Sequence, residues 1–331
     1  MSKSHEEILK DIIDVENISE TLIKERFGNV SKIEKIELYK FDAYKVLIDG
    51  KSYFIPQHKI STYSPKKSSI LKIQKKALTC LLPLPLSHFK HIDLGVLRKK
   101  ISELCNAEHP IEASNNWLVS LFNPDLAASF YVGEVLRSPT LNEYKDIILE
   151  AITSYFMGMN NISTLSLFPV LEGSLRDIHC KYSDGNENNV KAKQFIRKTK
   201  EIAEKRAFLA LKDYNLSPLN TNLHDNDKDS FYPLISVDCD VLYAFVTFFQ
   251  EILYKESNKT DQSFNRHLAI HLLKNDFGEQ ANFVRLIMSI SYIVYIEDLH
   301  NNITPFDNTP WDQDHFNDLK NTFHSLKAQR P

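Results

Sequence analysis

Long segments with apolar residues at helical spacing dominate the chain from about residue 141 onward. Leu141–Met157 and Leu165–Ile178 repeat apolar residues near the 3.6-residue period of a helix. Val237–Tyr254 and Ala281–Leu299 are more strongly apolar, and a basic helix is expected over residues 190–212. Because broad apolar faces must pack against one another, the pattern predicts a helical bundle and a mainly α fold.

Glycine is scarce, with 8 residues in a chain of 331. The scarcity argues against Gly-rich nucleotide-binding loops and against a fold with many tight β-turns. With 43% hydrophobic and 25% charged residues, the composition is that of an ordinary soluble protein. It excludes a disordered, collagen-like or disulfide-rich chain, and the length suggests two domains.

The N-terminal part predicts a small α+β module with a β-hairpin. Apolar residues at helical spacing predict a helix over residues 6–27, which Gly28 would end. Ala43–Ile48 and Lys51–Ile55 are rich in β-favouring residues and flank Asp49-Gly50. An Asp-Gly pair between two such runs is a strong signal for a two-residue hairpin loop.

The remainder of this half shows no catalytic constellation. Helices are expected over residues 93–105 and 115–136, and a loop over 61–70. A basic run here could contact phosphate or could be a solvated face: Lys66, Lys67, Lys72, Lys75 and Lys76. We therefore divide the chain into an α+β module of unknown role over 1–140, suited to recognition or assembly, and a helical bundle over 141–331.

The net charge and the cysteines limit which partners the protein could bind and which cellular compartment it could occupy. The net charge of −3 does not indicate nucleic-acid binding by the whole molecule, so any contact with a polyanion would be local. The four cysteines form no Cys-x-x-Cys pair, so we expect free thiols in a reducing cytosol. No signal-peptide core and no apolar stretch of about 18 residues is present. The sequence predicts a cytoplasmic protein with no membrane partner.

Two polar features interrupt the apolar helices. Glu172 and Arg176 lie one helical turn apart, so they could form an ordinary surface ion pair, or Glu172 could orient a catalytic cation. The segment Phe264–His271 lies between two apolar helices and places four residues between Arg266 and His271. An arginine and a histidine at this spacing are a weak signal alone, and the surrounding helices make them informative.

The segment Asn265–His271 resembles the motif of the HEPN family (higher eukaryotes and prokaryotes nucleotide-binding). That family is a bundle of four or five helices with an Arg-x(4–6)-His motif and a polar residue directly after the arginine, and Arg266, His267 and His271 match all three positions. Phe168–Arg176 is similar to the first core helix of such proteins. The resemblance covers roughly residues 141–302, and it departs at Leu272, where the family variants usually have glycine.

The resemblance implies a metal-independent endoribonuclease that needs no cofactor. It also implies a homodimer in which two motifs face each other across a twofold axis and form one composite site. Arg266 and His271 would be catalytic, assisted by His267 and Glu172. Many members of the family act in toxin or antiviral defence systems, so RNA is the expected substrate and a protein partner or antitoxin could bind through residues 1–140.

The residue types suit attack by a ribose 2′-oxygen on the adjacent phosphate. A neutral histidine can remove a proton near pH 7 and an imidazolium can donate one, while an arginine stabilises the growing phosphorane charge. On an ideal helix, residues five apart point about 140° away from each other. Arg266 and His271 therefore converge within one chain only if Arg266 precedes the first turn, whereas His267 and His271 share a face.

Further RNA contacts are expected around the motif. A helix that begins near Asn265 would point its N–H groups at a phosphate. The basic helix could follow the RNA backbone or could be a solvated face, through Lys191, Lys193, Arg197 and Lys198. His267 could instead bond locally at the helix start. No third ligand joins His267 and His271, so no metal site is expected.

Two other classes of function stay open. In the first, the bundle is a non-catalytic assembly module in which Arg266 and His271 are structural and pair with Glu172 or with backbone groups. In the second, the protein binds a nucleotide and uses Arg266 for the phosphate. Complete burial of His271 would argue against catalysis.

Overall fold

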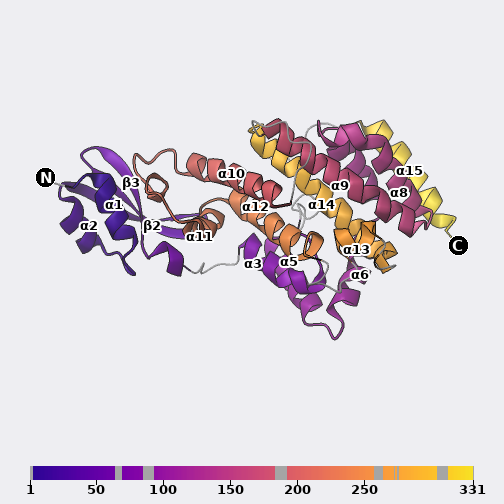
Figure 1. Ribbon diagram of the computed structural model, residues 1–331, viewed down its shortest axis with the longest axis horizontal. Coiled ribbons are helices and arrows are strands. Elements are labelled where there is room, and N and C mark those ends of the chain that lie inside the picture. The colour runs from indigo at the N-terminus through magenta and orange to yellow at the C-terminus, as the bar shows by residue number, and fades with distance from the viewer. Residues whose placement is uncertain are drawn as a thin grey trace. The chain divides into compact units, whose positions relative to one another are not determined.

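The protein is mainly helical and carries a three-stranded antiparallel sheet near its N-terminus (Figure 1). The structure is a computed structural model, and it describes residues 3–63, 69–84, 93–182, 192–256, 264–271, 273, 276–303 and 312–330. The predicted fold class, mainly α with an α+β N-terminal module, is confirmed. In these parts of the chain, no helix combines the length and the apolar character that crossing a bilayer requires.

The chain packs as two compact units that alternate along the sequence. The first unit contains Met1–Leu71 and Lys200–Tyr243, and the second contains Lys72–Thr199 and Ala244–Pro331. Residues 200–243 thus belong to the same unit as the N-terminal sheet. This division differs from a boundary at residue 140, and the assignment of 1–140 and 141–331 as domains stays a prediction.

The sheet of the first unit has the order β1 (Val30–Leu38), β2 (Phe41–Ile48) and β3 (Lys51–Pro56). Ile48 pairs with Lys51, so β2 and β3 are joined by Asp49 and Gly50 alone. Both residues have positive φ, 49° and 75°, as a type I′ turn requires. The predicted hairpin is confirmed, and β1 is a strand that the sequence pattern did not predict.

Two helices replace the single one expected over residues 6–27: α1 (His5–Ile13) and α2 (Glu20–Phe27). The chain leaves the helix between them because its backbone pairs with the segment after β3, where Ile18 N donates to Gln57 O at 2.9 Å. Ser19 then starts α2, since its side chain accepts from the backbone N of Leu22. Gly28 ends α2 with φ 74°, as predicted.

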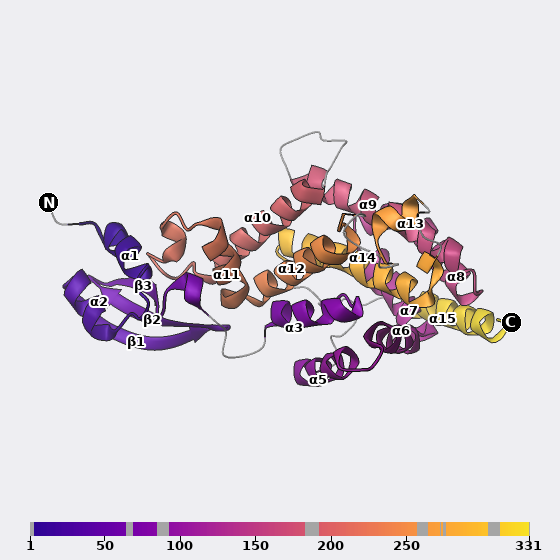
Figure 2. The same ribbon diagram turned by 60° about the horizontal axis from the view of Figure 1, so that its bottom comes forward.

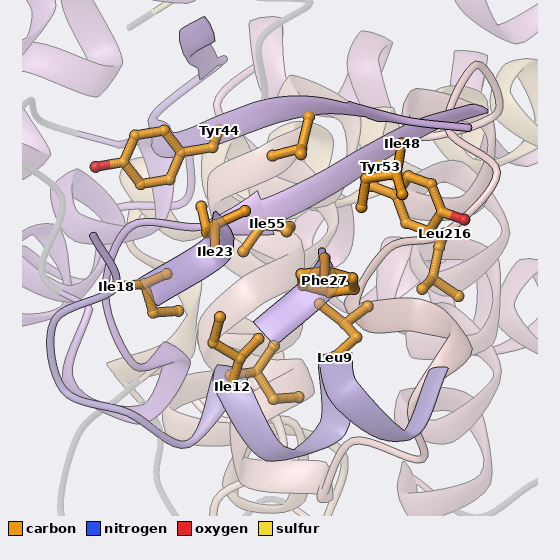
Figure 3. Packing of buried hydrophobic residues seen from close by; sticks show 12 residues of the cluster. Leu9, Ile12, Ile18, Ile23, Phe27, Tyr44, Ile48, Tyr53, Ile55 and Leu216 are labelled. Atoms are coloured by element: carbon orange, nitrogen blue, oxygen red, sulfur yellow. The ribbon is translucent and has the colours of Figure 1, made fainter. Parts of the chain in front are cut away.

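The core of this unit lies between the two helices and one face of the sheet (Figure 3). Alternate β2 residues Tyr44, Val46 and Ile48 face α1 and α2, and the cluster also includes Leu216. The opposite face carries Phe41, whose ring meets Phe231 edge-on at 4.9 Å. The first half of β2 is therefore buried on both faces, whereas Lys45, further along the Phe41 face, is exposed.

Phe231 belongs to α11 (Asp225–Ile235). The polar composition of residues 213–234, which are rich in Asn, Asp and Pro, predicts a loop there, and that prediction is wrong for the part that forms α11. The first part of α11 is polar, and only its last turns, Phe231 to Ile235, are buried. A short helix that is apolar at one end has too little periodicity to be recognised from sequence.

The described residues of the second unit form helices and connecting turns but no strand, and within the unit α9 packs against both α8 and α14 (Figures 1 and 2). Its elements, with those that continue into the first unit, are α3 (Ile70–Ala77), η2 (Leu78–Cys80), α5 (Leu94–Cys105), α6 (Pro110–Leu121), α7 (Pro124–Phe130), η3 (Tyr131–Val135), η4 (Leu141–Tyr144), α8 (Lys145–Phe156), α9 (Asn160–Tyr182), α10 (Ala192–Ala210), α12 (Val237–Phe248), η6 (Phe249–Leu253), α13 (Arg266–Ile270), η8 (Asp276–Gly278), α14 (Gln280–His300) and α15 (Gln313–Ala328). Short 3-10 helices in the first unit are η1 (Ile60–Thr62) and η5 (Pro218–Asn220).

Most of the long helices predicted for the second unit are confirmed, and one of them is divided into two. The helix expected over residues 115–136 is interrupted at Asn123, whose side chain caps α7 by accepting from the backbone N of Leu126 at 2.9 Å. Pro124 follows at the first helical position, where its missing N–H costs nothing. Much of the expected loop over 61–70 lies outside the described residues, as residues 64–68.

Candidate active site

Asn265 determines where α13 begins. Its Oδ1 accepts from the backbone N of His267 at 3.0 Å and of Leu268 at 3.3 Å. Its Nδ2 donates to the carbonyls of Ile252 at 3.1 Å and Lys255 at 2.9 Å. The side chain thereby ties the start of α13 to the end of η6 and fixes Arg266 as the first helical residue.

This geometry corrects two expectations about RNA contacts. The side chain of Asn265 is fully buried and its amide oxygen and nitrogen each hold two hydrogen bonds, so it is not available to RNA. The backbone N–H groups of His267 and Leu268 at the start of α13 already donate to the same side chain, so these two are not directed at a phosphate. Asn265 positions the motif instead of binding a ligand.

Arg266 forms an ion pair with Glu172 of α9, a residue 94 positions away in sequence. Its Nη2 lies 2.8 Å from both carboxylate oxygens. The two side chains are 19% and 22% exposed, so water screens this pair less than it would a surface pair. The contact joins the two segments that carry the family resemblance.

Glu172 also forms an ion pair with Arg176, as expected for residues one helical turn apart. The distance from Arg176 Nη2 to Glu172 Oε1 is 3.4 Å, and Arg176 is 48% exposed. A long, exposed pair of this kind stabilises a protein by a few tenths of a kcal/mol at most. Glu172 therefore contacts both arginines, and its contact with Arg266 is the closer one, whereas a role in orienting a catalytic cation stays a prediction.

The Arg266 guanidinium also lies close to the rings of His267 and Tyr254. Its Nη1 lies 3.3 Å from Nδ1 of His267, and its ζ carbon lies 6.0 Å from the centre of the Tyr254 ring. Because arginine can only donate, Nδ1 of His267 accepts in this contact, and the neutral ring then carries its proton on Nε2. The Nε of Arg266 is buried and has no hydrogen-bond partner among the described residues.

The two histidines of the motif differ in environment. Burial lowers the pKa of His267 below its usual value, and the charge of Arg266 and the neighbouring His271 lower it further, against the opposing effect of Glu172. His271 is exposed at the end of α13. The rings are nearly parallel, with centres 6.1 Å apart, which confirms that the two residues share a helix face.

The arrangement supplies the groups that phosphodiester cleavage needs. Arg266 provides a fixed positive charge, His267 provides a neutral N–H donor, and His271 provides an imidazole that is exposed to solvent. His267 is close to both of the others, because its Nδ1 meets Arg266 and its ring lies parallel to that of His271.

The basic helix α10 is linked to this site through aromatic rings. Phe195 on its buried face meets Phe249 at 5.1 Å, Phe249 stacks on Tyr254 at 4.2 Å, and Tyr254 meets His267 at 6.4 Å. Of the predicted RNA contacts on the helix, Lys193 and Arg197 are exposed and Lys198 is half-buried. Lys191 lies outside the described residues, as does Leu272.

Sequence reasoning missed Tyr254, Arg285 and Glu297. Arg285 is fully buried in α14, and it donates to backbone carbonyls of Leu81 and Cys80 and to the side chains of Asn282, Ser114 and Asn115. Burial lowers its pKa to about 10. A charged residue inside an otherwise apolar helix is the signal that could have identified it.

Glu297 is the second buried charge of α14. It accepts hydrogen bonds from the backbone N of Thr140 at 3.0 Å and from the hydroxyls of Ser138 and Thr140. Lys181 approaches it to 4.0 Å. Glu297 thereby attaches the start of η4 to α14, and Arg285 attaches residues 80–81 and α6 to the same helix.

Within the described residues, no three side chains of His, Cys, Asp or Glu gather closely enough to hold a metal ion. Comparisons of the chain with protein-family models, with curated proteins and with solved structures each found no match.

Proposed function

We propose that the chain is a metal-independent endoribonuclease of HEPN type that acts as a homodimer. In the reaction, a ribose 2′-oxygen attacks the adjacent phosphorus and the bond to the 5′-oxygen breaks. The products are a 2′,3′-cyclic phosphate and a 5′-hydroxyl. RNA is the substrate class, and no cofactor is involved.

The observation that carries this proposal is the Arg266–Glu172 pair with two parallel histidine rings beside it. Glu172 holds the guanidinium through Nη2, and Nη1 of Arg266 has two hydrogens, one directed at His267 and a second that would donate to a phosphate oxygen. His271 is exposed, as a group that meets a macromolecular substrate must be. A purely structural role would not require that exposure.

Each residue then has a distinct role. Arg266 stabilises the negative charge that grows on the phosphorane, and the Nε2–H of His267 donates to a phosphate oxygen. His271 removes the proton of the 2′-hydroxyl, and His271 of the second copy protonates the leaving 5′-oxygen. Glu172 is a positioning residue that acts through Arg266.

Two surfaces extend the proposal beyond the motif. Lys193, Arg197 and Lys198 of α10 would follow the RNA backbone, as would Lys191. Residues 1–140 would select the RNA or receive a protein inhibitor, which is the arrangement of a toxin or antiviral defence system in the cytoplasm.

The test is cleavage of a mixed RNA pool by the purified protein and by Arg266→Ala, with EDTA present. We expect the wild type to produce 2′,3′-cyclic phosphate ends and the variant to be at least about 100-fold slower, since removing one group that stabilises transition-state charge costs that much. His224→Ala is the matched control, because His224 is exposed and its side chain forms no cap hydrogen bond. Loss of cleavage in EDTA, or 3′-hydroxyl products, would contradict the proposal.

The second candidate is a non-catalytic assembly or nucleotide-binding module. The contact that favours it is again Arg266 with Glu172, because the same ion pair attaches α13 to α9 and could be purely structural. Under this alternative, Arg266→Ala would alter melting or self-association and there would be no cleavage to lose.

A further inference from the structure

Two of the four cysteines, far apart in sequence, meet in the second unit. Cys80 ends η2 and Cys105 ends α5, and their sulfur atoms are 3.1 Å apart. A disulfide has a sulfur–sulfur distance of about 2.05 Å, so the two atoms are about 1 Å from bonding distance. Both cysteines are free thiols.

The contacts around the pair hold the sulfurs face to face without a covalent bond. The thiol of Cys105 donates to the carbonyl of Lys76 at 3.4 Å, and Nζ of Lys76 donates to Ser102 Oγ at 2.8 Å. These two hydrogen bonds connect the end of α3 to the last turn of α5. The sulfurs therefore need only a small adjustment to bond.

The two thiols differ in access. Cys80 is fully buried, whereas Cys105 is half-buried and reachable from solvent. Burial, together with the neighbouring Cys105, raises the pKa of the Cys80 thiol to about 12. A thiol with so little thiolate cannot be the first nucleophile, so a reagent from solvent would meet Cys105 first.

We propose that Cys80 and Cys105 are a modification site that forms a reversible disulfide when a low-molecular-weight disulfide, such as glutathione disulfide, is the oxidant. The thiolate of Cys105 attacks one sulfur of the reagent, breaks its S–S bond and releases one thiolate, which takes up a proton. Sγ of Cys80 then attacks Sγ of Cys105 and breaks the mixed S–S bond, and the second reagent thiolate leaves and takes up the proton of Cys80. Two protein thiols are oxidised by two electrons, and the reagent is reduced to two thiols.

The bond would form beside Arg285, which is fully buried and donates several hydrogen bonds. The carbonyls of Cys80 and Leu81 both accept hydrogen bonds from Arg285. A covalent link from Cys80 to Cys105 would close the intervening chain into a loop and limit its freedom in the unfolded state. The oxidised protein should therefore melt at a higher temperature than the reduced protein.

The test uses the full chain with Cys180→Ala, which removes the exposed thiol that would compete for reagent. The protein is equilibrated with graded ratios of reduced and oxidised glutathione, unfolded, treated with iodoacetamide and digested. We expect a linked Cys80–Cys105 peptide two hydrogens lighter than the sum of its parts, with Cys239 alkylated. The melting temperature should rise by a few degrees and fall again with dithiothreitol.

Cys105→Ser is the control variant, because serine is close in size and the position is half-buried. It should lose both the linked peptide and the shift in melting temperature. If the variant does not fold, the mass measurement on the parent protein still decides the question. Alkylation of both Cys80 and Cys105 at the most oxidising ratio, or a link from Cys80 to any other cysteine, would overturn the proposal.

Discussion

Arg266 and Arg285 lie in the same unit of the molecule and are held in opposite ways. Arg285 is fully buried and its guanidinium donates to neutral acceptors from three segments of chain. Arg266 is partly exposed, is paired with a carboxylate and retains an Nη1 group beside a histidine. Arg285 has no access to a ligand, whereas Arg266 has both access and a partner that orients it.

The comparison separates a structural cation from a candidate functional one. A buried charge is stable only if its donors find acceptors, so Arg285 commits its hydrogen bonds to packing residues 80–81 and α6 onto α14. A cation that must bind phosphate has to keep some donors and some exposure. Substitutions at the two positions should therefore affect different measurements.

The largest expected effect is on stability at position 285. Arg285→Leu removes the donors and leaves carbonyl and side-chain oxygens buried without partners. We expect the free energy of unfolding to fall by about 3–5 kcal/mol, as for breaking a buried charged network. For Arg266→Leu, we expect the free energy of unfolding to fall by only about 1–2 kcal/mol. Urea denaturation of both variants measures the difference. Equal losses of unfolding free energy at the two positions would contradict the division into a structural arginine and a candidate functional one.

A smaller effect is expected where the carboxylate that orients Arg266 is changed. Glu172→Gln keeps the size of the side chain and removes its charge, so the guanidinium is held less firmly. We expect kcat for RNA cleavage to fall by about 10- to 100-fold with little change in KM, because misplacement of a catalytic group lowers the chemical step. Glu172→Asp should restore part of the rate.

An unchanged kcat in Glu172→Gln would show that the pair is structural. Arg176→Gln is the matched control, since it removes the long, exposed contact to the same carboxylate and should leave kcat unaltered.

The smallest effect concerns the pH dependence of stability. The pKa of His267 is lower in the folded protein than the value of about 6.5 expected for an unfolded chain. Above that value the residue is neutral in both states. As the pH falls, the unfolded chain takes up the proton first, so the stabilising contribution of neutral His267 is lost as pH falls through the folded-state pKa.

This dependence can be isolated with one variant. Unfolding by urea at pH 7.5 and pH 5.5 should show a smaller loss of stability in His267→Gln than in the wild type. The same loss in both proteins would mean that His267 is not held neutral by its surroundings.

Much of the fold was predictable because its signals are local. Asp49-Gly50 requires positive φ at both residues, and the long apolar runs at 237–254 and 281–299 can be stable only as buried helices. The break between α1 and α2 was not predictable, since it depends on backbone pairing with residues 57–59. Tertiary partners of this kind leave no periodic pattern in the sequence.

In the candidate site, too, the residues that depend on tertiary partners could not be predicted from the sequence. The motif residues Arg266, His267 and His271 were identified from spacing and resemblance, and the orienting contact from Glu172 was one of two interpretations. The role of Asn265 was misjudged, because a polar residue next to an arginine can bind a ligand or cap a helix, and only the carbonyls of Ile252 and Lys255 distinguish the two. Arg285 was missed because it lies within a segment read as continuously apolar.

The most direct test of the account measures cleavage and stability together in His271→Ala. Since His271 is exposed, the account predicts an unchanged melting temperature and helix content with RNA cleavage reduced at least about 100-fold. A lower melting temperature with no cleavage detectable in the wild type, or full cleavage in the variant, would contradict it.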